Sequence, residues 1–136
     1  MPGIKFQLGR AYLQDHKPEQ ASVVLNQAVT ANPGYTDAIL LLAELNLRTG
    51  KALQAVTPLE DLLKTNAKLT RAQVLLADVY RAVGRLDDAA AIFRQQIAQF
   101  PQNADAYIFL GLIQEQQKKT AEARQSFEKA VELAPD

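Results

Sequence analysis

The sequence predicts an all-α fold in which four helical hairpins follow one another along the chain. Three observations predict it: a repeat of 34 residues, apolar residues at helical spacing inside each period, and proline or glycine where one apolar run ends and the next begins. The chain has 136 residues, so it holds four whole periods. We therefore expect eight short helices that alternate in direction.

The repeat is visible in four sets of positions, each spaced by 34 residues. One set holds small residues, a second holds alanine, a third holds leucine or phenylalanine, and a fourth holds proline with one alanine. These sets are Gly9, Ala43, Ala77 and Gly111; Ala21, Ala55, Ala89 and Ala123; Leu25, Leu59, Phe93 and Phe127; and Pro33, Ala67, Pro101 and Pro135. Four sets at one spacing do not arise by chance, so the fold itself must repeat.

Each period is expected to form two helices joined by a tight turn. Gly50 and Gly84 lie between the two apolar runs of their periods, where glycine can take the left-handed conformation that ends a helix. Proline lacks an amide donor and clashes with the preceding turn, so the prolines of the fourth set end the second helix. Thr36, Thr70 and Thr120 are the expected N-caps. The expected helices span 3–15, 19–31, 36–49, 52–65, 70–83, 86–99, 104–117 and 120–133.

Composition excludes several classes of partner and site. Fifteen basic and fifteen acidic residues give a formal net charge of +0, so no overall field attracts nucleic acid or an anionic membrane. No apolar run reaches the roughly 20 residues of a membrane span. The absence of cysteine removes disulfides and thiolate metal sites, and it leaves the compartment, cytoplasm or periplasm, undetermined. We expect a soluble protein, whose alanine- and glutamine-rich composition suits a bacterial source.

The period resembles the tetratricopeptide repeat, which combines Leu-Gly, a tyrosine three residues on, and then spaced Ala, Phe, Ala and Pro. The matching residues are Leu8, Gly9, Tyr12, Ala21, Leu25, Ala28 and Pro33 in the first period; Leu76, Ala77, Tyr80, Gly84, Ala89, Phe93 and Pro101 in the third; and Tyr107, Leu110, Gly111, Ala123, Phe127, Ala130 and Pro135 in the fourth. The sequence departs from the family pattern at Lys5, Asn46, Ala67, Gln96 and Gln114.

The resemblance covers the whole chain and implies a right-handed α-solenoid of four antiparallel helical hairpins, eight helices in all. It implies a single domain over 1–136, with repeats at about 2–35, 36–69, 70–103 and 104–136. The chain starts within the repeat pattern and ends where another period would open. We therefore expect it to be a segment of a longer protein.

The sequence is predicted to hold no catalytic site, cofactor or metal, and not to be an enzyme. His16 is the only histidine, and with Asp15 beside it the pair could be read as an oriented general base. No serine, cysteine or second histidine is positioned to share a mechanism, so an exposed turn residue is the favoured interpretation. The acidic pairs at 60–61 and 87–88 are expected to face solvent near helix starts or on an outer face rather than to bind a metal ion.

The expected ligand surface is the concave groove that, as the resemblance implies, is lined by the first helix of each hairpin. On these helices the residues that do not face the partner helix point into the groove. Most of them are apolar, and exposed apolar surface of this kind marks binding sites. The expected lining residues are Phe6, Arg10, Leu13, Leu40, Leu41, Glu44, Leu47, Arg48, Arg71, Val74, Leu75, Asp78, Arg81, Ile108, Phe109, Leu112 and Glu115.

Two further expectations concern this groove. Packing against the adjoining unit is an equally favoured alternative for Leu40, Leu41, Val74 and Leu75. A subset of the family holds the carboxylate of chaperone peptides with lysine and asparagine side chains on successive first helices. Those positions here hold Phe6, Arg10, Leu41 and Leu75. Only Arg71 remains of such a clamp, so a chaperone peptide is disfavoured.

The favoured function is a non-catalytic scaffold that binds a peptide or helix of a protein partner through apolar anchors. The alternative is a structural spacer or self-associating segment of a larger repeat protein. In that case the next repeat or another copy of the chain covers the apolar side of the last helix at Phe127 and Val131. RNA binding would need a basic groove, and this one is predicted to be apolar, so nucleic acid is not an expected partner.

Overall fold

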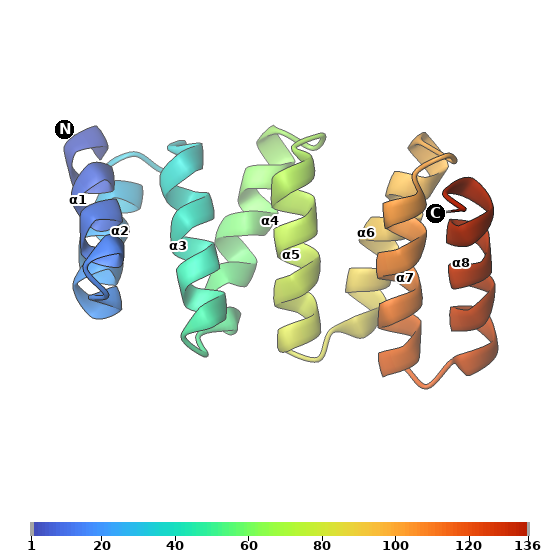
Figure 1. The fold of residues 1–136 in the computed structure, drawn as a ribbon. Helices are drawn as coiled ribbons and strands as arrows, with labels where there is room; N and C mark the ends of the chain where they lie inside the picture. Colours follow the sequence, from blue (N-terminus) through green and yellow to red (C-terminus); the bar gives the residue numbers. More distant parts are fainter. Residues whose placement is uncertain (1, 136) are drawn as a thin grey trace. The chain divides into compact units, whose positions relative to one another are not determined.

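The computed structural model describes residues 2–135, and within this range the chain is all-helical (Figure 1). The helices pack into two compact units, an N-terminal unit that ends at Val79 and a C-terminal unit that begins at Tyr80. The elements are α1 (Pro2–Gln14), α2 (Pro18–Ala31), α3 (Thr36–Arg48), η1 (Ala52–Ala55), α4 (Val56–Thr65), α5 (Thr70–Ala82), α6 (Leu86–Gln99), α7 (Ala104–Gln116) and α8 (Thr120–Leu133). None of these helices is long and apolar enough to cross a membrane.

The observed helices match the expected ones to within one residue at each end, with one exception. The expected helix over 52–65 begins as the short 3-10 turn η1, and the α-helix proper starts at Val56. Pro58 explains the difference, because it has no amide to donate to the carbonyl of Gln54 and its ring clashes with that carbonyl in a continuous α-helix. The amides of Gln54 and Val56 bond instead to carbonyls three residues back, those of Lys51 and Leu53.

The same type of tight turn joins the two helices of each of the four hairpins. Gly50 and Gly84 have φ of 77° and 84°, as expected for glycine at a helix end. His16 and Lys118 occupy the same position in the first and last hairpins, with φ of 57° and 63°. In each turn the amide of the next residue bonds at 2.7 to 2.9 Å to a carbonyl five residues before it. These bonds join Lys17 to Tyr12, Lys51 to Asn46, Arg85 to Tyr80 and Lys119 to Gln114.

The three expected threonine N-caps are wrong. Helix α3 begins at Thr36 itself, and the capping position is Tyr35, whose carbonyl already accepts the first helical bond from Ile39. Helices α5 and α8 likewise start at Thr70 and Thr120. In all three cases the chain enters the helix one residue earlier than the threonine hydroxyl would need in order to cap it. The side-chain cap that does form is at Asn103, which accepts from the amide of Ala106 at 3.3 Å.

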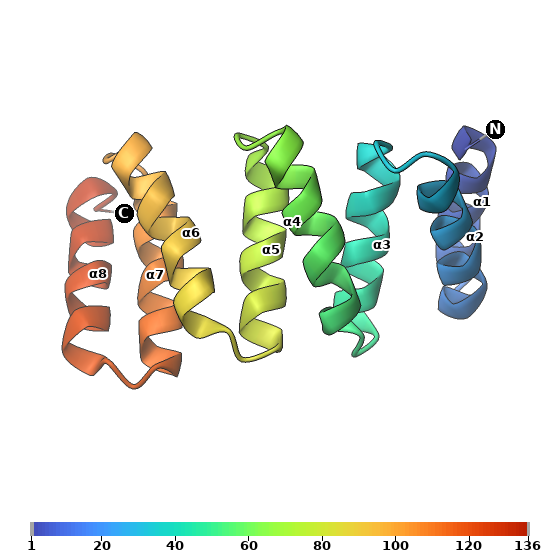
Figure 2. The same ribbon diagram turned by 180° about the vertical axis from the view of Figure 1, so that it is seen from behind.

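In the N-terminal unit, α1 and α2 form an antiparallel hairpin and α3 packs against α2 (Figures 1 and 2). The small residue Gly9 lets α1 approach α2, because a Cβ added at Gly9 would lie 2.8 Å from the Cγ of Leu25. Buried residues of α2 and α3 form one apolar cluster between the helices, made of Ala21, Leu25, Leu42 and Leu45. Helix α3 also packs on η1 and α4, which completes the second hairpin.

In the C-terminal unit, α7 packs against both α6 and α8, and α6 lies behind α7 in Figure 1. A Cβ added at Gly111 would lie 2.7 Å from the ring of Phe127, so α7 and α8 also meet at a small residue. The ring of Phe93 in α6 stacks on Phe109 of α7, with centroids 5.2 Å apart. Small residues therefore lie where the paired helices approach, and the Phe93 ring fills space between successive hairpins.

Candidate functional site

A cleft of about 730 Å³ lies between α3 and α5 in the N-terminal unit. Eight of the residues expected in the groove line it, and they come from two helices that are separated in sequence by η1 and α4. The lining residues are Leu41, Glu44, Leu47, Arg48, Arg71, Val74, Leu75 and Asp78.

Helical geometry explains why these residues share the cleft. On α3 they fall at intervals of three, three and one residues from Leu41 to Arg48, which keeps them on one face. On α5 the intervals from Arg71 to Asp78 are three, one and three residues. Leu47 and Val74 are half-buried, so each offers apolar surface to a ligand while its other side packs on the protein. The cleft therefore has an apolar floor and a rim of four charged side chains.

The rim is electrically balanced. It holds two carboxylates and two guanidinium groups, and one of each forms an ion pair across the cleft: Nη2 of Arg71 donates to Oε1 of Glu44 at 2.7 Å. Arg71 was the one residue consistent with a carboxylate clamp, and here its guanidinium is already engaged by a carboxylate of the protein. The geometry thus gives no positive site for a peptide terminus at Arg71.

Other expected groove residues of the N-terminal unit lie elsewhere. Leu40 is only 3% exposed and does not line the cleft, because it precedes Leu41 by one residue and so points about 100° away around the helix. Phe6 and Leu13 pack against the cluster between α2 and α3. Phe6 also lies 5.4 Å from the ring of Tyr35, and the guanidinium of Arg10 lies 5.9 Å above the Phe6 ring.

The expected groove residues of the C-terminal unit have their own surroundings. Phe109 is partly buried by its stacking on Phe93, whereas Ile108 is 39% exposed and Leu112 is half-buried. Nε of Arg81 donates to Oε1 of Gln116, which ties the end of α5 to the end of α7. Glu115 lies in a second hollow, of about 560 Å³, formed mainly by α8.

The α8 hollow contains residues that the groove prediction did not include. Ala123, Phe127 and Val131 form its apolar part, and Thr120, Arg124 and Glu128 surround them. The sequence did carry a signal for it, since Phe127 and Val131 were expected to need a cover.

The histidine considered as a general base lines neither hollow. His16 is exposed in the first hairpin turn, where its amide bonds to the carbonyl of Leu13. Across residues 2–135 no three His, Cys, Asp or Glu side chains are grouped as metal ligands.

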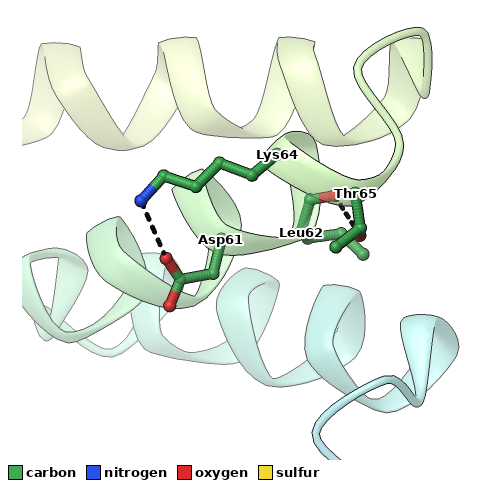
Figure 3. A network of polar contacts seen from close by, with 4 residues as sticks. All are labelled: Asp61, Leu62, Lys64 and Thr65. Carbon is green, nitrogen blue, oxygen red and sulfur yellow. Dashed lines mark hydrogen bonds and ion pairs between the residues drawn. The ribbon is translucent and has the colours of Figure 1, made fainter.

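Carboxylates of both acidic pairs contact neighbouring side chains. Asp61 forms an exposed ion pair with Lys64 at 3.4 Å, while the nearby hydroxyl of Thr65 donates to the carbonyl of Leu62 (Figure 3). In the other pair, Asp87 accepts from Gln117 at 2.6 Å and Asp88 pairs with Arg85 at 2.8 Å. These carboxylates therefore act in surface contacts within the helices and between neighbouring ones.

Two models of the tetratricopeptide repeat match this chain, one over residues 12–79 and the other over 74–136. The chain belongs to the tetratricopeptide repeat family. The matched segments together cover residues 12–136, which include part of the first period and the whole of the other three. The all-helical repeat fold predicted from the 34-residue spacing is thus confirmed.

Proteins similar to this chain include two solved structures and one relative found by sequence. The crystal structure of MamA has a TM-score of 0.82 and 25% identity, covering 97% of this chain and 77% of that one. YrrB, a TPR protein with an unusual peptide-binding site, has a TM-score of 0.83 and 21% identity, with coverage of 97% and 68%. Anaphase-promoting complex subunit 7 of Arabidopsis thaliana is 35% identical over 100 residues, which span 74% of this chain and 18% of that protein.

Proposed function

We propose that this chain is a non-catalytic protein-interaction module that binds a peptide or helix in the cleft between α3 and α5. The observation that carries the proposal is the cleft itself, in which apolar side chains from two helices lie open beside charged ones. Apolar clefts of several hundred Å³ with a few polar groups are the usual form of a binding site. YrrB shares the fold and is a peptide-binding protein, which supports the same class of function here.

The chemistry of the cleft favours a ligand with apolar anchors and little net charge. The floor formed by Leu41, Leu47 and Val74 suits leucine-like or aromatic side chains spaced along a helix or an extended segment. Because the rim charges cancel, a strongly acidic or basic ligand gains no long-range attraction. The rim then sets the orientation of the ligand more than its affinity.

The proposal can be tested by selecting peptides from a displayed random library on the immobilised chain and measuring their binding by fluorescence anisotropy. Leu47→Asp and Val74→Asp each place a carboxylate in the apolar floor, so we expect either variant to weaken binding about tenfold or more, equivalent to at least ~1.4 kcal/mol. Leu53→Asp is the matched control, because Leu53 is 73% exposed and lies outside the cleft. Helicity and the denaturation midpoint confirm that the variants are folded.

Salt dependence separates this function from nucleic-acid binding. Contacts through apolar anchors should persist between low and high ionic strength, whereas binding that neutralises phosphates weakens steeply with salt. Selected peptides that bind Leu47→Asp and Val74→Asp as tightly as they bind the original chain would overturn the proposal. Failure to enrich any peptide on the chain would count against it equally.

A further inference from the structure

The hollow on α8 is an open apolar surface at one end of the C-terminal unit. Val131 is 61% exposed and Phe127 is half-buried, although both are large apolar residues on the same face of the helix. The hollow measures about 560 Å³. Its apolar centre also includes Ala123, and Glu115 reaches it from the end of α7. A surface of this size and character is where a further helix could pack.

The repeat identifies what would fill this hollow. Four of its lining residues have counterparts three periods, or 102 residues, earlier in the chain. These counterparts lie in the N-terminal unit, where α3 covers them. Glu115, Ala123, Phe127 and Val131 correspond to Leu13, Ala21, Leu25 and Val29. Ala21 and Leu25 belong to the apolar cluster that α3 completes with Leu42 and Leu45, and Leu13 and Val29 pack against it. The α8 hollow therefore holds the positions that form one half of that contact.

The matching other half lies on α1. Moving back one period relates Leu41, Leu42 and Leu45 of α3 to Gln7, Leu8 and Ala11 of α1. Leu42 and Leu45 are 7% and 2% exposed, whereas Leu8 is 41% exposed and Ala11 is also exposed. Ile4 is 64% exposed, although its counterpart Ala38 is fully buried. Positions that a preceding helix covers elsewhere in the repeat are thus open to solvent on α1.

We propose that the α8 hollow of one copy of this chain receives the α1 face of a second copy, so that the chains associate head to tail. The 34-residue period sets the register of the contact: Phe127 would meet Leu8 and Ala11 as Leu25 meets Leu42 and Leu45. The contact is a continuation of a packing arrangement that the protein already uses between α2 and α3.

The polar residues of the two faces are also complementary. Leu13 and Leu41 both pack on the cluster between α2 and α3, and their counterparts at the two faces are Glu115 and Gln7. In the register above, Gln7 and Glu115 lie on the two faces that meet, and an amide can donate to a carboxylate. Each face therefore carries a polar residue where the contact between α2 and α3 has a leucine, which suits an interface that is exposed to water when the copies are apart.

The two faces differ, so the contact is heterologous, and a copy that uses one face keeps its other face available for a further copy. The expected result of sedimentation velocity is therefore a mass that rises with concentration and passes beyond that of a dimer. Leu8→Glu blocks the α1 face and Val131→Glu blocks the α8 hollow, so each variant alone should remain monomeric at every concentration.

Mixing the two variants gives the sharpest test. The Leu8→Glu chain keeps its α8 hollow and the Val131→Glu chain keeps its α1 face, so an equimolar mixture should form a one-to-one dimer and nothing larger. Ile4→Glu provides a second α1 variant at a more exposed position, in case Leu8→Glu lowers stability. Helicity measured for every variant establishes that the chains are folded.

Two control variants separate this interface from other modes of association. Val23 is 57% exposed on α2, and its counterparts Thr57, Ala91 and Gln125 are also exposed, so Val23→Glu should leave the mass distribution unchanged. Leu47→Asp alters the α3–α5 cleft and should also have no effect. A chain that stays monomeric at all concentrations, larger species that persist in Leu8→Glu or Val131→Glu, or a mixture without a dimer would overturn the proposal.

Discussion

The first hairpin (α1–α2) and the last (α7–α8) hold the same kinds of residue at the same positions, three periods apart, yet they bury them differently. Gly9 and Gly111 lie where the paired helices approach, and Leu25 and Phe127 pack against them. Leu25 is completely buried, because α3 covers α2, whereas Phe127 is only half-buried. Burial in this fold thus depends on the neighbouring hairpin as much as on the residue, as expected for a protein stabilised by contacts between adjacent repeats.

The largest difference between the two hairpins should appear when these apolar side chains are removed. Leu25→Ala leaves a cavity in a fully covered site and should lower the free energy of unfolding by about 2–5 kcal/mol. Phe127→Ala removes a larger side chain, but part of its ring already contacts water, so we expect a loss below about 2 kcal/mol. Urea denaturation followed by circular dichroism measures both values.

The measurement is best made at the lowest workable protein concentration. Association through the α8 hollow would cover Phe127 and raise its contribution to stability. A loss for Phe127→Ala equal to that for Leu25→Ala under these dilute conditions would show that the two hairpins are not buried differently. Val23→Ala serves as the exposed control and should change stability by less than about 0.5 kcal/mol.

Replacing Gly9 or Gly111 with alanine tests the same comparison, with a smaller expected change in stability. A Cβ at Gly9 would lie 2.8 Å from Cγ and Cδ2 of Leu25, and the branch point of a buried leucine has no room to move. Gly9→Ala should therefore destabilise the protein by about 1–3 kcal/mol. A Cβ at Gly111 would meet Cε1 and Cζ of Phe127, the outer end of a ring that is partly exposed.

For Gly111→Ala the ring can turn aside, and alanine favours a helix interior over glycine by about 0.5–1 kcal/mol. The two terms offset each other, so the unfolding midpoint should stay close to that of the original chain. The result that contradicts this reasoning is a Gly111→Ala loss as large as the Gly9→Ala loss, which would mean that the Phe127 ring is held as rigidly as Leu25.

Much of the fold could be predicted from sequence because its determinants are local and repeated. Helix ends depend on turn residues within a few positions, and the 34-residue spacing let four copies of each signal support one another. The 3-10 turn at η1 was missed even though its signal, Pro58, is local. The turn position of Gly50 and Gly84 was recognised by residue type, so His16 and Lys118, which take the same left-handed conformation without being glycine, were not.

The candidate site was less predictable because it depends on how separate helices meet. The face of α3 and α5 that lines the cleft follows from helical geometry, and those residues were expected. The ion pair between Glu44 and Arg71 joins residues 27 positions apart, and nothing in the sequence indicates it. Gln114 was taken as a weak point of the repeat, but the buried hydroxyl of Ser126 donates to its side chain at 2.6 Å, so the departure is a matched pair across α7 and α8.

The smallest expected effect concerns a feature that the first and last hairpins share. His16 and Lys118 hold left-handed backbone conformations that cost a residue with a Cβ roughly 1–2 kcal/mol. Glycine removes this cost but loses more entropy on folding, so His16→Gly and Lys118→Gly should each stabilise the protein by about 0.5–1 kcal/mol. The reverse change, Gly84→Ala, should destabilise it by a similar amount, although no atom lies within 4 Å of the added Cβ. Thermal unfolding of the three variants checks the signs, and destabilisation by both glycine substitutions would show that the side chains of His16 and Lys118 contribute more than their backbone strain costs.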